Sequence, residues 1–211
     1  MGHYAEYAKV LTALFVIANP LGAILPFLTL TADQSEGERR RTARITALTV
    51  ALVLLASAFF GDALLALFGI RIASFQVGGG ILILLIAIAM LHARRSRTSH
   101  TPEEMEEAAD KTSVGVVPLG VPLLAGPGAI TTVIIYAHRA QDPFSMAFIV
   151  FSIALLALSI WIALRLAEPL NGFLGKTGVN IAMRLMGLLL AAIAIEFIAH
   201  GLNQLFPGLS K

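Results

Sequence analysis

The sequence predicts an all-α polytopic membrane protein with six transmembrane helices in a 3+3 inverted repeat, whose first and fourth helices are broken. Three observations predict this fold. The chain is 57% hydrophobic and 13% charged, with a mean hydropathy of +0.84, whereas soluble domains are about 25% charged. Six apolar segments are long enough to cross a bilayer. Two pairs of short motifs recur in the two halves of the chain at nearly equal spacing.

A spanning helix needs about 20 mainly apolar residues, because a helix rises about 1.5 Å per residue and the hydrocarbon core is about 30 Å thick. The six predicted spans are residues 9–31, 45–68, 73–91, 114–137, 146–166 and 181–204. They leave no room for a sizeable soluble domain. We therefore divide the chain into a first three-helix repeat over residues 1–92, a linker over 93–113 and a second three-helix repeat over 114–211.

Composition also argues against several function classes. The pI is near 9.2, but the net charge is only +2 and the basic residues fall in loops, so nucleic-acid binding is not expected. The absence of cysteine excludes disulfides and thiolate chemistry. Five scattered histidines show no metal-binding spacing, and no nucleophile motif or P-loop appears. We expect no enzyme activity, no metal and no cofactor. The N-terminus lacks the pattern of a secretory signal.

The loops predict the orientation. The connections after the first, third and fifth spans hold eleven of the fifteen Lys and Arg residues, and the other side holds the remaining four. The positive-inside rule then places both termini outside and the long loops in the cytoplasm. Ser35 and Glu38 form a predicted capping box, and Thr101-Pro102 predicts a second helix start. Residues 103–110 read as a short solvated helix, with a metal or catalytic role for its carboxylates as the alternative.

Two short sequence motifs each occur once in the first half of the chain and once in the second. The segment 69–73 (GIRIA) resembles 178–182 (GVNIA), and the segment 20–24 (PLGAI) resembles 127–130 (PGAI). The offsets are 109 for the first pair and 107 for the second. Each half holds three spans, and an odd number makes the second half enter the membrane from the opposite side.

The two proline-containing motifs lie near the middle of the first and fourth predicted spans. Proline removes a backbone donor and clashes with the preceding turn, so each span should break there. Asn19 is a favourable N-cap with Pro20 at the first helical position, and Gly126 with Pro127 provides the same arrangement. Each break then starts a half-helix inside the membrane with unpaired N–H groups and a positive dipole end.

Because the repeats are inverted, these two positive ends should approach the centre from opposite sides and bind an anion such as a substrate carboxylate. The predicted substrate-binding residues are Asn19, Pro20, Leu21, Gly22, Gly126, Pro127, Gly128, Ala129, Thr131 and Thr132. Two simpler alternatives stay open. The prolines could only kink the helices for packing, and the threonine hydroxyls could bond back to helix carbonyls.

Two acidic residues are candidates for ion coupling, and one run of glycines is a candidate for helix packing. Glu196 is placed deepest in a span, so we expect it to face the protein interior and to be a coupling acid; a structural role, or a place near the outer interface with His200, is the alternative. Asp62 is the second coupling candidate. The run at 78–80 (GGG) favours close helix packing.

Longer stretches resemble a known family. They are 19–22 (NPLG), 38–41 (ERRR), 100–104 (HTPEE) and 117–130 (VPLGVPLLAGPGAI). The chain resembles the MarC family of integral membrane proteins over essentially its whole length. The resemblance implies six spans and a bacterial inner-membrane or archaeal membrane location. Some members are described as transporters of small neutral amino acids such as alanine and glycine, coupled to cations or protons, and relatives are linked to amino-acid export. The family commonly has an arginine where this chain has Gln76.

The sequence therefore predicts a transporter that moves a small zwitterion across the inner membrane by alternating access, with the carboxylate held between the two half-helix ends. Its partners are the substrate and the lipid bilayer, with a homo-oligomer possible. Two rivals remain: a channel or export pore for another small solute, and a non-transporting membrane factor in which the breaks serve only packing.

Overall fold

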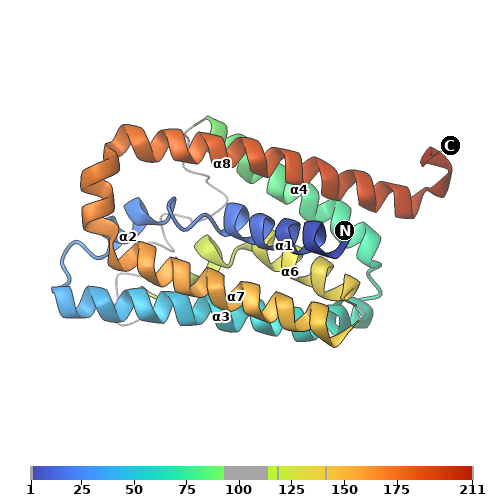
Figure 1. Cartoon of the computed structure of the whole chain (residues 1–211), viewed down its shortest axis with the longest axis horizontal. Coiled ribbons are helices and arrows are strands. Elements are labelled where there is room, and N and C mark those ends of the chain that lie inside the picture. Colours follow the sequence, from blue (N-terminus) through green and yellow to red (C-terminus); the bar gives the residue numbers. More distant parts are fainter. Residues whose placement is uncertain (1, 93–113, 118, 141, 211) are drawn as a thin grey trace.

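A computed structural model describes residues 2–92, 114–117, 119–140 and 142–210. Every element in these ranges is a helix (Figure 1). The first half contains α1 (Gly2–Ala18), α2 (Ile24–Leu30), α3 (Glu36–Leu67) and α4 (Ile72–Leu91). The second half contains η1 (Leu119–Leu124), α6 (Pro127–Arg139), α7 (Pro143–Arg165), α8 (Ala167–Leu205) and η2 (Pro207–Ser210). The helix predicted at 103–110 and its Thr101 cap lie outside the described residues.

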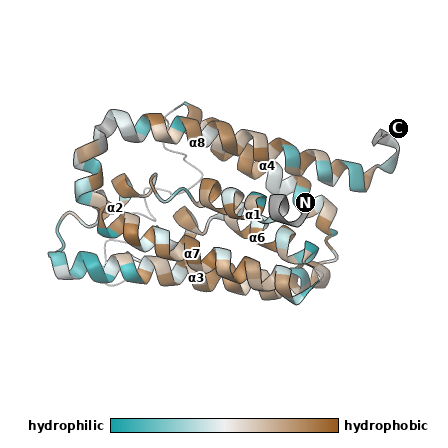
Figure 2. Cartoon of the chain, in the orientation of Figure 1, coloured by the Kyte–Doolittle hydropathy of each residue, from teal (hydrophilic) through white to brown (hydrophobic). Residues whose placement is uncertain are grey.

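Four helical segments are long and apolar enough to cross a membrane: Glu36–Leu67, Ile72–Leu91, Pro143–Arg165 and Asn180–Leu205. They match the second, third, fifth and sixth predicted spans. Large apolar side chains on them point outward, and Leu52 and Leu188 are 66% and 62% exposed. Figure 2 shows hydrophobic residues along the middle of the long helices and hydrophilic residues gathered toward their ends. This is the surface expected of a bundle whose surroundings are lipid.

The predicted first and fourth spans are broken. The chain leaves α1 at Ala18 and enters α2 at Ile24, and it leaves η1 at Leu124 and enters α6 at Pro127. The prediction of two breaks at the Asn-Pro and Gly-Pro positions is confirmed. The pieces differ in length, since α1 is longer than α2 whereas α6 is longer than η1.

Both ends of α3 are built by local sequence. The Ser35 side chain accepts a hydrogen bond from the Glu38 backbone N–H, and the Glu38 carboxylate accepts one from the Ser35 N–H, which confirms the predicted capping box. At the other end Gly69 has φ +65°. Its N–H donates to Ala66 O at 3.0 Å, and the next N–H, that of Ile70, donates to Leu65 O at 2.9 Å. This Schellman motif ends α3 and turns the chain into α4.

Helices α4 and α8 pack closely along an antiparallel seam of small residues (Figure 1). Three pairs alternate glycine with alanine at seven-residue spacing. A Cβ added to Gly201 would lie 2.8 Å from Ala73 O, one added to Gly80 would lie 3.0 Å from Ala194 O, and one added to Gly187 would lie 3.1 Å from Ala87 O. Small residues let helix backbones approach closely where lipid supplies no hydrophobic driving force. The predicted packing role of the glycine run is confirmed for Gly80, which faces α8, and for Gly79, which faces Thr131 of α6, but not for Gly78, which has nothing within 4 Å of a Cβ.

Helix α8 changes direction at Gly175, which has φ +61° and ψ 176° (Figure 1). The segment before Gly175 crosses one end of the bundle, and the segment after it runs along α4. The motif comparison pairs Gly69 with Gly178, but the two glycines are not equivalent. Gly69 lies in a turn between two helices, whereas Gly178 lies inside α8, three residues after the bend.

Most of the other helix contacts also join the two halves of the chain. Helix α3 packs against α7 and α6, and α1 packs against α6 and α7. The buried core runs through these contacts and includes Leu14, Leu54, Leu124 and Ile153, all at most 1% exposed. Both broken spans are therefore held in the middle of the bundle by the unbroken helices.

Candidate functional site at the two helix breaks

The first break is closed by its own asparagine. Asn19 has φ +46°, a left-handed conformation that Asn adopts more readily than most residues. Its Oδ1 accepts a hydrogen bond from the Gly22 N–H at 3.2 Å, and its carbonyl oxygen accepts one from the same N–H at 3.0 Å. The predicted role of Asn19 as a helix N-cap is wrong, because the N-cap of α2 is Ala23 and the Asn19 side-chain bond closes a turn. The predicted helix start at Pro20 is wrong, because residues 20–23 form a turn and α2 begins only at Ile24.

The second break follows the predicted pattern more closely. Gly126 is the N-cap of α6 in an extended conformation, φ −77° and ψ 176°, and Pro127 occupies the first helical position. No side chain caps this end. Gly128 and Ala129 are buried, and their N–H groups donate to no acceptor within the part of the chain that the structure describes. These two donors point along the helix axis at its positive end.

The two breaks lie near each other along α1. A Cβ added to Gly128 would lie 3.2 Å from Ile17 Cγ2, two residues before Asn19, and 3.2 Å from Ile83 Cγ1 on α4. Each break also has an open side, since Leu21 is 36% exposed and Pro127 is exposed as well. The structure therefore brings the predicted residues of the two breaks into one region. Their role in binding a substrate stays a prediction.

The two threonines of α6 differ in their surroundings. Thr132 Oγ1 donates to Gly128 O at 2.8 Å, which is the back-bonding alternative of the sequence analysis. Thr131 is buried, and its methyl group faces α4, where a Cβ added to Gly79 would lie 1.9 Å from Thr131 Cγ2. Gly79 therefore sets the distance between α4 and the half-helix after the second break.

Gln76 lies one turn before Gly79, on the same face of α4. Its side chain is 1% exposed, and its Nε2 has no hydrogen-bond partner among the described residues. An orphaned buried amide costs about 1–3 kcal/mol. Such a group needs an explanation, and a ligand or a water is the usual one. The sequence singles out Gln76 only through the family resemblance; the direct signal is a lone amide inside a 20-residue apolar helix.

Comparison with known proteins identifies the family. A family model described as "MarC family integral membrane protein" matches residues 4–206. The chain belongs to the MarC family. It is 41% identical over 206 residues to the UPF0056 membrane protein YhcE of Escherichia coli strain K12, covering 98% of this chain and 96% of that protein. It is 38% identical over 193 residues to UPF0056 membrane protein MJ1677 of Methanocaldococcus jannaschii, covering 91% and 93%. No solved structure matches the chain.

These relatives are similar over nearly their whole length, and their names describe them only as membrane proteins. The chain is thus an integral membrane protein with several apolar helices. The family resemblance found in the sequence is confirmed.

The two acids proposed for coupling in this MarC protein lie at the same end of the bundle, away from α2. Glu196 Oε1 pairs with Lys9 Nζ of α1 at 3.3 Å, and its side chain is 50% exposed. The expectation that Glu196 faces the protein interior is therefore wrong, because the lysine draws the carboxylate to the outside of α8. Asp62 Oδ2 lies 2.8 Å from His138 Nδ1 at the last turn of α6 and is 54% exposed. A coupling role for either acid stays a prediction.

Proposed function

We propose that this MarC protein is a secondary transporter of small neutral amino acids of the alanine and glycine type. The observation that carries the proposal is the uncapped start of α6, where the buried N–H groups of Gly128 and Ala129 lack acceptors among the described residues. Two N–H donors at the positive end of a helix form a ready anion site. A zwitterion supplies a carboxylate without adding net charge to the membrane interior.

The neighbours of these donors support a small substrate. Gly128 lies within about one methyl group of Ile17 and Ile83, because a Cβ there would already be 3.2 Å from both. Ala125 and Ala129 are at most 1% exposed. A substrate amino acid with a side chain larger than that of alanine would have to displace α1 or α4. Proximity to the first break would let Asn19 and Gly22 border the same substrate.

We also propose that the six spans form a 3+3 inverted repeat. The pairings support it, because α1 packs on α6, α3 on α7 and α4 on α8, so that each element of one half contacts its counterpart in the other. The glycine–alanine seam adds a second sign. Gly187 follows Gly80 by 107 residues and Ala194 follows Ala87 by 107, the offset that also separates Pro127 from Pro20. In such folds one half rocks against the other around a central site.

The proposal also covers the orientation of the chain in the membrane and the coupling of transport to an ion gradient. With the arginine-rich start of α3 in the cytoplasm, both termini and the Lys9–Glu196 and His138–Asp62 pairs lie on the outer side of the inner membrane. Each pair links one half of the chain to the other. A proton or cation that neutralises Asp62 or Glu196 would loosen the link, which is how either acid would couple an ion gradient to rocking. Direction, uptake or export, follows from the gradient.

Transport by the purified protein in proteoliposomes tests the proposal. Labelled alanine and glycine are offered with and without a proton or sodium gradient. Accumulation driven by a gradient is the expected result. Downhill leakage without accumulation would instead indicate a pore for small solutes. The absence of any flux of small amino acids would overturn transport of this substrate class and favour a non-transporting membrane factor.

A pair of glycine variants locates the site. Gly128→Val places methyl groups against Ile17 and Ile83 and should reduce uptake at least about tenfold, as a misplaced binding geometry does. Gly78→Val is the matched control, because nothing lies within 4 Å of a Cβ at Gly78. Equal uptake by the two variants, both folded by gel filtration, would rule out a site at the second break.

A further inference from the structure

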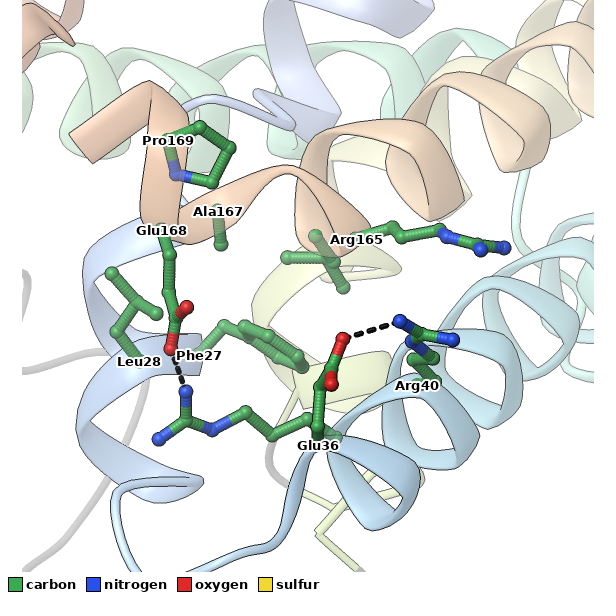
Figure 3. A pocket seen from close by; sticks show the side chains of 10 residues that line it. Phe27, Leu28, Glu36, Arg40, Arg165, Ala167, Glu168 and Pro169 are labelled. Atoms are coloured by element: carbon green, nitrogen blue, oxygen red, sulfur yellow. Dashed lines mark hydrogen bonds and ion pairs between the residues drawn. The ribbon is translucent and has the colours of Figure 1, made fainter. Parts of the chain in front are cut away.

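A pocket lies at the end of the bundle where α2, α3, α7 and the start of α8 meet (Figure 3). Its volume is roughly 200 Å³. Its lining consists of Phe27, Leu28, Glu36, Arg39, Arg40, Leu164, Arg165, Ala167, Glu168 and Pro169. None of the residues predicted to bind substrate lines it, so this pocket is separate from the proposed transport site.

The pocket carries a surplus of positive charge. Both of its carboxylates are already used, since Glu168 pairs with Arg39 and Glu36 pairs with Arg40 one turn along α3. Arg39 also donates to Thr31 O at 2.9 Å at the end of α2. The third arginine, Arg165, has no carboxylate partner among the residues that the structure describes.

Arg165 is held in place by an aromatic ring. Its guanidinium carbon lies 5.3 Å from the centroid of the Trp161 ring, four residues earlier on α7. A cation stacked on tryptophan keeps its N–H donors free for a ligand in the plane of the guanidinium. Figure 3 shows that the side chains of Arg165 on α7 and Arg40 on α3 lie at the same side of the pocket. Two guanidinium groups from different helices thus border one opening.

An apolar stripe lies at the end of α7, on residues that precede and follow Arg165 in the sequence. Leu158 and Ile162 on α7 and its C-cap Leu166 follow one another at four-residue spacing and are 48%, 43% and 45% exposed. Residues four apart lie on one face of a helix, so these side chains form a continuous outward stripe along the span. Phe27 and Leu164, both at most 2% exposed, close the floor of the pocket. The tryptophan at the charged end is typical of a membrane–water interface.

We propose that this pocket binds the phosphate headgroup of an anionic phospholipid, with one acyl chain along the stripe on α7. Arginine recognises phosphate through paired N–H donors, and basic pockets between transmembrane helices are known receptors for anionic headgroups. A free phosphate ion would use the same guanidinium groups, but it would leave the adjoining stripe unused. The stripe therefore favours the lipid.

The test uses the full chain purified in detergent, with phosphatidylglycerol, phosphatidylcholine or inorganic phosphate added. Phosphatidylglycerol should raise the melting temperature and remain bound in native mass spectrometry, whereas phosphatidylcholine and phosphate should do neither. Arg165→Gln should weaken phosphatidylglycerol binding about fivefold, the loss expected for one basic residue near an anionic surface. Arg40→Gln should act in the same direction, and Arg165→Lys should keep part of the affinity.

The matched control is Arg71→Gln, since Arg71 is an exposed arginine at the start of α4, outside the pocket lining. It should bind phosphatidylglycerol like the unmodified chain. Equal responses to the two lipids would overturn the proposal, as would equal binding by the Arg165 and Arg71 variants. An equal effect of inorganic phosphate would overturn the lipid assignment. None of these readouts depends on transport.

Discussion

The two helix breaks have similar sequences and different structures. At the first break, Asn19 adopts a left-handed conformation and its side chain accepts the N–H of Gly22. The helix that follows, α2, has only 7 residues. At the second break, Gly126 is extended, no side chain caps the end, and the 13-residue α6 that follows is buried along most of its length.

This difference assigns different tasks to two sites that the sequence treats as equivalent. At the first break the Gly22 N–H is bonded to Asn19, and the helix that follows is too short to carry much dipole, so the main task of this break is to turn the chain. The second break leaves two donors at the start of a longer, buried helix. We therefore propose that anion recognition falls mainly to α6, so that the symmetric clamp of the sequence-based hypothesis would become an asymmetric one.

The largest expected effect is on the contact that holds α6 in place. Gly79→Ala would put a Cβ 1.9 Å from Thr131 Cγ2, and overpacking of this kind should destabilise the protein by about 3 kcal/mol. Gly78→Ala meets nothing within 4 Å and should be stabilised by about 0.5–1 kcal/mol through helix propensity. Thermal unfolding in detergent measures both. If Gly79→Ala melts no lower than Gly78→Ala, α4 does not support the second break as described.

The next effect concerns the first break. Asn19→Ala removes the side-chain acceptor of the Gly22 N–H and forces alanine into a left-handed conformation, at a combined cost of about 2 kcal/mol. Asn19→Gly removes the same hydrogen bond, but glycine adopts that conformation freely, so the loss should stay near ~1 kcal/mol. The same melting experiment separates them. Equal melting temperatures for the two variants would show that the left-handed backbone contributes nothing to the first break.

Sequence reasoning located the breaks but not their asymmetry. Pro20 and Pro127 stand out because proline disrupts any helix, whatever surrounds it. The left-handed Asn19 and the late start of α2 depend on how residues 20–23 turn, which local sequence does not determine. The placement of Glu196 also failed, since it depends on Lys9 approaching from a helix 187 residues away. Long-range pairs of this kind carry no periodic signal.

A smaller effect is expected at the orphaned amide beside α6. Gln76→Leu keeps a similar volume and removes a buried Nε2 that has no partner within the described residues, so the protein should be stabilised by about 1 kcal/mol. If the Gln76 amide contacts the substrate during transport, uptake should fall in the same variant. Gln204→Leu, at an exposed position, is the control and should change neither. A lower melting temperature for Gln76→Leu would mean that the amide is satisfied in the folded protein.

The smallest change in stability gives the sharpest test of the second break. Gly126→Ser offers a hydroxyl that can accept the N–H of Gly128 or Ala129, as N-cap serines do, and should stabilise α6 by only a few tenths of a kcal/mol. The same hydroxyl competes with the substrate carboxylate for those donors, so KM for alanine should rise severalfold. Gly126→Ala adds the same carbon without an acceptor. If the donors bind the carboxylate, the serine variant has the higher KM of the two, because only the serine satisfies them. Equal KM values would mean that added bulk alone acts there, and that the free N–H groups of α6 are not what the substrate recognises.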